Sequence, residues 1–288
     1  MVEKEVMKVG ISACSNGHNK EWEPQIREIS DVLRGLGIEP VPADHLVEKV
    51  DAFSGTDEER AADLMRFYRD RSIEAVYDIS GGDLANGVLK YLDFDVIANT
   101  DKTFWGYSDL TTVINAIYAM TGKSSVLYQV KNMIRSEAEL QQNRFKAYLS
   151  GDDSQLFNIS SRFLQGTHME GVVLGGNIRC FTKLAGTPFW PDMKDKILLL
   201  ESLGGGSGQI ATLFAQLEQI GVFDQVAGVL LGTFTQYESA DLKLSVYDLL
   251  KMHISPDLPV AHTAEIGHGH DSKAIVIGRV MEIKEQYN

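Results

Sequence analysis

Up to Val130 the chain alternates short apolar segments with segments of helical periodicity, and this alternation limits the folds that it can adopt. Lys8 to Cys14, Ile38 to Pro42 and Ala75 to Ile79 are short and apolar, as buried strands are. The helical segments lie between them, at Trp22 to Leu36 and at Asp57 to Ser72. Such alternation predicts a parallel, doubly wound α/β sheet.

The chain has 288 residues, enough for two ordinary domains. The alternation continues through Leu84 to Leu92, Phe94 to Ala98 and Ser125 to Val130, and a polar run follows. We therefore predict an N-terminal α/β domain (1–134), a linker (135–165) and a smaller C-terminal α/β domain (166–288). The last part is rich in short strands, predicted at Gly171 to Gly176, Lys196 to Glu201, Val226 to Leu231, Pro259 to Thr263 and Ala274 to Ile277.

One serine stands at the join between a strand and a helix. The stretch TFWGYSDLTT, Thr103 to Thr112, reads as a short aromatic strand, a bend at Gly106 and a helix start. A hydroxyl on such a turn is exposed at the tip of a sheet, and the following backbone N–H can stabilise an oxyanion. Ser108 is therefore a candidate nucleophile, although a serine that only caps the helix fits the same stretch.

In doubly wound sheets ligands bind at the carboxyl ends of the strands, where Cys14, Gly81-Gly82 and Ser108 are expected. Cys14 is a second possible nucleophile, but no base accompanies it in the sequence and a buried, inert thiol is the simpler interpretation. The glycine pair and Ser108 are thus predicted to meet at neighbouring strand ends.

A serine nucleophile needs a base, and the base needs a group that orients it. Glu201 ends the apolar strand KILLL, and His262, His268 and His270 crowd the last strand-loop-strand unit. Each of these could also be a solvated loop residue.

Two segments carry features of other kinds of site. The tract His268-Gly269-His270-Asp271 could ligate zinc, but no convincing partner motif accompanies it, so we predict no metal. The loop Gly204 to Gly208 resembles a phosphate cradle without the lysine or the glycine spacing of nucleotide-binding motifs. We therefore predict no cofactor.

The net charge of −13 disfavours nucleic acid or an anionic membrane surface as a partner. The two cysteines, Cys14 and Cys180, follow no disulfide or metal spacing, which favours a reducing, cytoplasmic location. No stretch reaches the roughly 18 consecutive apolar residues of a spanning helix. We expect neither export nor membrane insertion.

Taken together, these segments resemble the LD-carboxypeptidases, a serine peptidase family that includes murein tetrapeptide carboxypeptidases and microcin C self-immunity peptidases. The resemblance spans nearly the whole chain, from Ile79 to Gly278 and in the right order. Its most specific parts are GYSDLT at Gly106 to Thr111, LGGN at Leu174 to Asn177 with the following GTP, and the final glycine-histidine segment.

The resemblance implies a serine, glutamate and histidine triad. It places the nucleophile on Ser108, the carboxylate on Glu201 and the base on His268. The resemblance favours His268 over His270 because His268 follows Gly267 and lies ten residues before Gly278, the spacing that the family keeps between its histidine and its closing P-I-G.

The same resemblance implies an oxyanion hole made by the backbone N–H of Asp109 and of Gly81 or Gly82. We place substrate contacts on Asp83, Asn86 and Tyr107.

The implied activity is hydrolysis of an amide bond near a peptide carboxyl terminus, with the L,D-bond of a murein tetrapeptide as the leading substrate and a peptidyl-nucleotide as the alternative. Three departures border the expected site: Ser80 stands where the murein enzymes usually have arginine, SLGGGSG follows Glu201, and Tyr128-Gln129-Val130 replaces a His-Gly-Pro segment. Family members are commonly homodimers. The alternative of another class is a non-catalytic small-molecule or nucleotide-binding protein with the same α/β layers.

Overall fold

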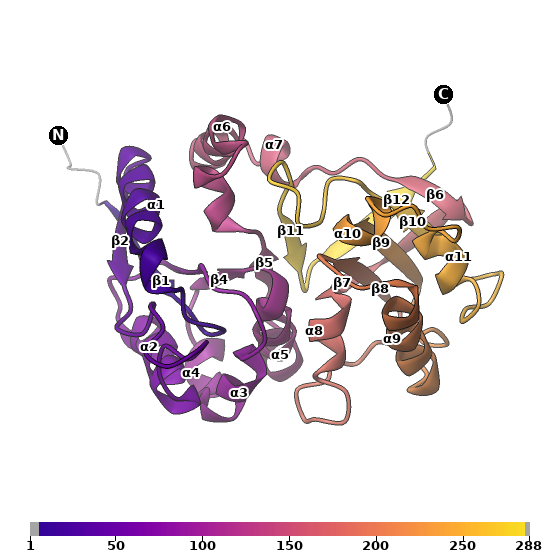
Figure 1. The fold of residues 1–288 in the computed structure, drawn as a ribbon, viewed down its shortest axis with the longest axis horizontal. Helices are drawn as coiled ribbons and strands as arrows, with labels where there is room; N and C mark the ends of the chain where they lie inside the picture. The colour runs from indigo at the N-terminus through magenta and orange to yellow at the C-terminus, as the bar shows by residue number, and fades with distance from the viewer. Residues whose placement is uncertain (1–5, 286–288) are drawn as a thin grey trace.

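The computed structural model describes residues 6–285, which form two six-stranded sheets with helices packed around them (Figure 1). The first sheet has the strand order β11-β5-β4-β3-β1-β2 and the second has the order β12-β7-β8-β9-β10-β6. The first sheet is parallel except where β11 joins β5. The predicted fold class, α/β with a doubly wound N-terminal sheet, is confirmed.

The elements up to Ile134 carry the first sheet and its helices, close to the positions that the sequence predicts. They are β1 (Met7–Ser12), η1 (Lys20–Trp22), α1 (Glu23–Gly35), β2 (Ile38–Pro42), α2 (Asp57–Arg69), β3 (Ala75–Asp78), α3 (Ala85–Val88), η2 (Leu89–Tyr91), α4 (Phe94–Ala98), β4 (Thr103–Gly106), η3 (Ser108–Leu110), α5 (Thr111–Thr121), β5 (Ser125–Leu127) and η4 (Val130–Ile134).

The later elements carry the second sheet and, with β11, one edge strand of the first sheet. They are α6 (Ala138–Leu149), α7 (Ser154–Phe157), β6 (Arg162–Gln165), β7 (His168–Asn177), α8 (Ile178–Thr182), β8 (Lys196–Ser202), α9 (Ser207–Gln219), β9 (Gly228–Phe234), α10 (Thr235–Glu238), α11 (Val246–Leu250), β10 (Val260–His262), β11 (Ile275–Ile277) and β12 (Val280–Lys284).

Local chemistry explains where several helices begin and end. The Thr56 side chain accepts from the backbone of Glu59, and Glu59 reaches back to the Thr56 backbone, so that a capping box starts α2. Asp93 starts α4 as a simple N-cap, since its side chain accepts from the Val96 N–H. Gly122, with φ +71°, ends α5 in a left-handed conformation that favours glycine.

The chain does not stay in the second sheet after β10. Strand β11 pairs antiparallel with β5 of the first sheet, with Ile275 opposite Leu127 and Ile277 opposite Ser125. In Figure 1 it lies beside β5, between the two halves of the molecule. The segment between β10 and β11 therefore passes from one sheet to the other, and it carries His268.

Buried hydrogen bonds join the two halves. The Asn115 side chain on α5 donates to Gly175 O at 2.9 Å and accepts from Gly175 N at 2.9 Å, while Asn177 N donates to Thr111 Oγ1 at 3.0 Å. Gly175 and Gly176 have φ of +104° and +132° there, and a Cβ on Gly176 would lie 2.7 Å from Thr111 Oγ1. The LGGN segment is thus shaped by a close backbone approach to α5.

A buried ion pair adds to this contact. Lys183, just after α8, donates to the Asp109 carboxylate at 2.5 Å, and the Asp109 side chain is fully buried. Arg179, one turn earlier, pairs with Asp83, but both of these side chains are largely exposed.

We expect Lys183→Met to destabilise the fold by about 3 kcal/mol, because it leaves the Asp109 charge buried without its cation. Arg179→Met, on the adjoining helix α8, is the matched control, and it should cost less than about 1 kcal/mol because the Arg179–Asp83 pair is exposed. Chemical unfolding of the three proteins measures both changes. Equal losses of unfolding free energy in the two variants would contradict the claim that burial of the Asp109 carboxylate makes its ion pair the more important one.

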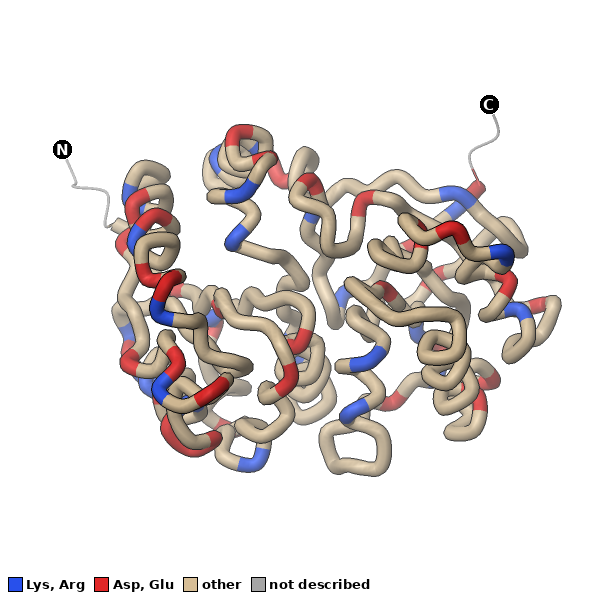
Figure 2. The backbone as a smooth tube through the Cα atoms, viewed as in Figure 1, with Lys and Arg blue, Asp and Glu red and all other residues tan. Residues whose placement is uncertain are grey.

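Charges are spread over both halves. Figure 2 shows acidic residues on most elements, with basic residues interspersed among them and not gathered in one stripe. Among the described residues, no helix is long and apolar enough to cross a membrane.

Candidate active site

Ser108 begins η3, directly after β4 and Tyr107. Its φ of +57° is in the left-handed region, which is strained for a residue with a Cβ and is typical of a nucleophile held on a sharp strand-to-helix turn. Gly106 permits the turn, because a Cβ there would lie 2.7 Å from the Leu110 Cβ. Ser108 is partly exposed although its neighbours on both sides are buried.

Glu201 and His268 meet at the junction of the two sheets. His268 Nδ1 lies 2.7 Å from Glu201 Oε2, and Glu201 is completely buried near the end of β8. A carboxylate on Nδ1 holds that nitrogen in its protonated form, so that Nε2 is the free, basic nitrogen.

Two further side chains hold Glu201. The Tyr107 hydroxyl donates to Oε2 at 3.2 Å and Asn177 Nδ2 donates to Oε1 at 3.1 Å. Burial, and next the charge of Glu201, raise the pKa of Tyr107, which therefore stays protonated as a donor. Asn177 was not predicted as a site residue, although the LGGN motif that contains it was.

The His268 ring packs against the residue that precedes Ser108. The rings of His268 and Tyr107 are 5.0 Å apart, edge to face, and Tyr107 immediately precedes Ser108. His268 Nε2 is buried and has no hydrogen-bond partner among the described residues. A buried polar atom of this kind needs a partner, and a serine hydroxyl or substrate can provide one.

The Gly81-Gly82 turn lies beside Ser108. A Cβ on Gly81 would be 4.0 Å from the Ser108 Cβ. Gly82 has φ +118°, and a Cβ there would overlap the Asn16 side chain at 2.3 Å, so both conformation and space require glycine. The turn is held from both sides, since Asn16 N donates to Gly81 O at 3.1 Å and Arg179 donates to Gly82 O at 3.0 Å.

Ser80, at the position of the first sequence departure, is tied to the end of β3. Its backbone N–H and its hydroxyl donate to Asp78 Oδ1 at 2.9 and 2.5 Å, and its hydroxyl accepts from Ser15 N at 3.0 Å. Burial raises the pKa of Asp78, an effect that the hydrogen bonds from Ser80 oppose. This network fixes the backbone that leads into the glycine turn.

The residues predicted to contact the substrate, and Asp109 of the predicted oxyanion hole, differ in burial and in hydrogen-bond partners. Tyr107, predicted to contact substrate, is buried and its hydroxyl is directed to Glu201. Asp83 is exposed and pairs with Arg179, and Asn86 is exposed on α3. The Asp109 side chain is buried and accepts from Ser15 Oγ and Ala85 N, so that only its backbone N–H is available to the site.

The structure separates the two histidines of the final segment. His270 is exposed and its Nδ1 lies 2.8 Å from Ser136 Oγ, away from Glu201. Within the described part of the chain, the group whose ligand atoms could surround a metal ion is elsewhere, at His168, Glu170 and Glu282 on the exposed edge of β7 and β12. Glu201 and His268 are not part of it.

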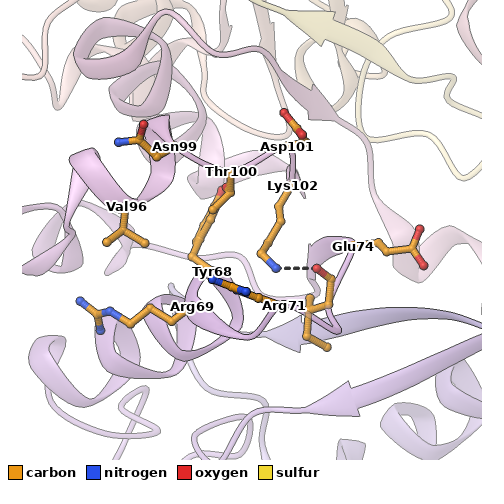
Figure 3. Close-up of a pocket in the computed structure, with 10 residues that line it drawn as sticks. Tyr68, Arg69, Arg71, Glu74, Val96, Asn99, Thr100, Asp101 and Lys102 are labelled. Atoms are coloured by element: carbon orange, nitrogen blue, oxygen red, sulfur yellow. Dashed lines mark hydrogen bonds between the residues drawn. The ribbon is translucent and has the colours of Figure 1, made fainter.

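A surface pocket of about 610 Å³ lies at the other end of the first sheet, where β3 and β4 begin (Figure 3). Lys102 enters it, but its ammonium donates to the backbone oxygens of Asp70 and Ile73 at 2.5 and 2.6 Å. In parallel sheets ligands bind at the carboxyl ends of strands, and this pocket is at the amino ends. It is therefore not the candidate active site.

A serine on a strained turn beside a glycine turn, and a buried glutamate-histidine pair, define a two-domain α/β protein with the residue types that a hydrolase site needs. The LD-carboxypeptidase N-terminal domain model matches residues 9–129 and the LD-carboxypeptidase C-terminal domain model matches residues 170–283. The chain belongs to this peptidase family.

Individual relatives carry different names. The probable murein peptide carboxypeptidase of Bacillus subtilis is 28% identical over 254 residues, which are 85% of this chain and 80% of that protein. The microcin C7 self-immunity protein MccF of Escherichia coli is 25% identical over 267 residues, 81% of this chain and 78% of that protein.

Solved structures confirm the fold. MccF in complex with aspartyl sulfamoyl adenosine superposes with a TM-score of 0.86 at 22% identity, covering 98% of this chain and 97% of that one. A muramoyltetrapeptide carboxypeptidase from Oxalobacter formigenes superposes with a TM-score of 0.78 at 22% identity, covering 97% and 96%.

Proposed function

We propose that this protein is a serine carboxypeptidase in which Ser108, His268 and Glu201 form the catalytic triad. The observation that carries the proposal is the pairing of His268 Nδ1 with the buried Glu201. This pairing leaves Nε2 without a partner among the described residues, on a ring that packs against Tyr107, the residue before Ser108. Neutral imidazole held in this tautomer is the general base that a serine nucleophile needs.

The proposed reaction uses only groups of this chain. His268 Nε2 takes the Ser108 proton as Oγ attacks the carbonyl carbon, and the N–H groups of Asp109 and of the Gly81-Gly82 turn stabilise the oxyanion. The imidazolium then gives its proton to the leaving amine, and water, activated by the same nitrogen, releases the acyl group from Ser108. Glu201 stabilises the imidazolium throughout.

We further propose the L,D-amide bond of a murein tetrapeptide as substrate, with release of D-alanine. The names of the B. subtilis and O. formigenes relatives support this choice. A peptidyl-nucleotide is the second candidate, favoured by the MccF structures that contain sulfamoyl nucleosides. Action on small peptides in the cytoplasm, without a cofactor and as a homodimer, stays a prediction from the sequence and the family.

Mass spectrometry of the products decides between the two substrates. The purified protein is incubated separately with a murein tetrapeptide and with an aminoacyl-sulfamoyl adenosine. The proposal expects D-alanine from the first and no cleavage of the second. Cleavage of the sulfamoyl compound alone would replace the murein substrate, and a product cut at an internal bond would exclude a carboxypeptidase.

The two histidines give a matched pair of variants. His268→Ala should lower kcat by about 10⁴-fold or more, because it removes the base, whereas His270→Ala should retain most of the activity. His270 is exposed and contacts Ser136, so His270→Ala shows whether any substitution in this loop lowers activity. Steady-state kinetics with the tetrapeptide measures both, and the opposite ranking would show that the base is assigned to the wrong residue.

A further inference from the structure

A cationic cluster, made of Trp22, Lys131 and Arg135, takes no part in the reaction described above. Trp22 ends η1, while Lys131 belongs to η4 and Arg135 follows it. The Lys131 ammonium is 5.6 Å and the Arg135 guanidinium carbon 5.4 Å from the centre of the Trp22 ring. Two cations therefore share one aromatic ring, which holds them close together.

No carboxylate in the described part of the chain lies within ion-pair distance of Lys131 or Arg135. Asp78 favours the charged form of Lys131, but its oxygens already accept from Ser12, Cys14 and Ser80. Burial, and next the charge of Arg135, lower the pKa of Lys131 to about 8. An anion between the two cations would relieve this repulsion.

The cluster stands at the wall of the candidate active site. Lys131 Nζ donates to Ser80 O at 3.4 Å, at the start of the glycine turn beside Ser108. The next residue, Asn132, donates to Gly269 O at 3.2 Å, directly after His268. Helix η4 thus extends from the turn that supports the oxyanion to the loop that carries the base.

We propose that Lys131 and Arg135 bind the free carboxylate at the C-terminus of the peptide substrate. The inference rests on the proposed function and deepens it, since a fixed site for the terminal carboxylate restricts cleavage to the end of a peptide. A carboxylate accepts charge-assisted hydrogen bonds from both cations, whereas a terminal amide offers neither the charge nor the same acceptor geometry.

Binding to the Ser108→Ala variant tests the cluster without turnover. The probes are one murein tetrapeptide as the free acid and as the C-terminal carboxamide, measured by calorimetry. Adding Lys131→Gln should weaken binding of the acid by about 10- to 100-fold and leave binding of the amide unchanged. Lys131→Arg should retain most of the affinity. Lys90→Gln is the control, since Lys90 is an exposed lysine 4.8 Å from the Tyr91 ring.

The outcomes separate this inference from the proposed function. Failure of the wild-type protein to cleave any peptide would defeat the proposed function, yet binding would still report on the cluster. Equal affinity for acid and amide before substitution, or equal loss for both after Lys131→Gln, would overturn the inference. Arg135→Gln provides a second variant at an exposed position, should Lys131→Gln fail to fold, and the same selective loss is expected.

The affinity for the free acid should also fall above about pH 8. The pKa of Lys131 is lowered to about 8, so its cation is present below that pH and lost above it. Arg135 lies beside Lys131 on the same Trp22 ring. His18, which is stacked on Trp22, is neutral in this range because burial lowers its pKa to about 3. Asp78 favours a cation at position 131 in both the unchanged protein and the variant. An arginine side chain keeps its charge above pH 8, so Lys131→Arg should abolish the alkaline loss of affinity. The same alkaline loss in that variant would overturn the assignment.

Discussion

Ser108→Ala should lower kcat for the tetrapeptide by about 10⁶-fold and leave the protein folded. The substitution removes the proposed nucleophile and keeps a Cβ on the same strained turn, so the backbone at φ +57° meets no new constraint. The remaining N–H groups of the turn and the binding contacts retain only a small part of the rate enhancement. Steady-state kinetics measures the loss, and circular dichroism checks the fold.

A serine outside the site controls for the substitution itself. Ser136 is exposed and its hydroxyl contacts His270, so Ser136→Ala should be nearly as active as the unchanged protein. An acylating or phosphonylating probe should label Ser108 and leave the alanine variant unlabelled. Near-normal activity of Ser108→Ala would show that Ser108 is not the nucleophile. Tight ligand binding by the unchanged protein, with neither labelling nor turnover, would favour the alternative of a non-catalytic binding protein.

The sequence patterns of the first sheet are local, and the structure agrees with them closely. Ile38 to Pro42 is a strand with the predicted bounds, and Ala75 to Ile79 differs from β3 only at its last residue. Parallel strands buried on both faces read as short apolar runs, so each run can be recognised without knowing its neighbours. The placement of Gly81-Gly82 beside Ser108 follows from the same reasoning, because carboxyl ends of parallel strands lie at one edge.

Pairing between distant segments was not predictable in this way. Ala274 to Ile277 is predicted as another strand of the C-terminal part, yet the strand that forms there, β11, pairs with β5 of the first sheet. Nothing in a three-residue apolar run specifies its partner, since many strands could accept it. This crossing brings the His268 loop to the junction of the sheets, so the sequence alone could not establish that Glu201 and His268 meet.

The polar partners of the site were missed for a related reason. Asn177 follows two glycines and Lys183 follows a short helix, and either residue could have been a solvated surface group. The structure shows that Asn177 at the end of β7 donates to Glu201 on β8, and that Lys183 after α8 pairs with Asp109 on η3. Both contacts join different elements. A buried carboxylate needs hydrogen-bond donors or a cation. Glu201 at a predicted strand end and Asp109 at a predicted helix start were therefore a signal that such partners lie elsewhere in the chain.

Glu201→Gln is the second variant with a large expected effect, a fall in kcat of about 10⁴-fold with the nucleophile and base both present. Glu201 accepts from three donors, His268, Tyr107 and Asn177, and an amide has only one oxygen for them. If its NH₂ group faces His268, the imidazole must accept at Nδ1 and carry its proton on Nε2. In that tautomer His268 cannot take the proton of Ser108.

The control is Tyr107→Phe, which removes one 3.2 Å hydrogen bond to Glu201 and leaves the carboxylate on His268. Its kcat should fall only about 2- to 10-fold, in line with the net value of one hydrogen bond. A purely structural role for Glu201 would lower stability and leave kcat per folded molecule unchanged, so activity is normalised to the fraction that an active-site probe labels. Comparable kcat for Glu201→Gln and the unchanged protein would mean that something other than this carboxylate orients His268.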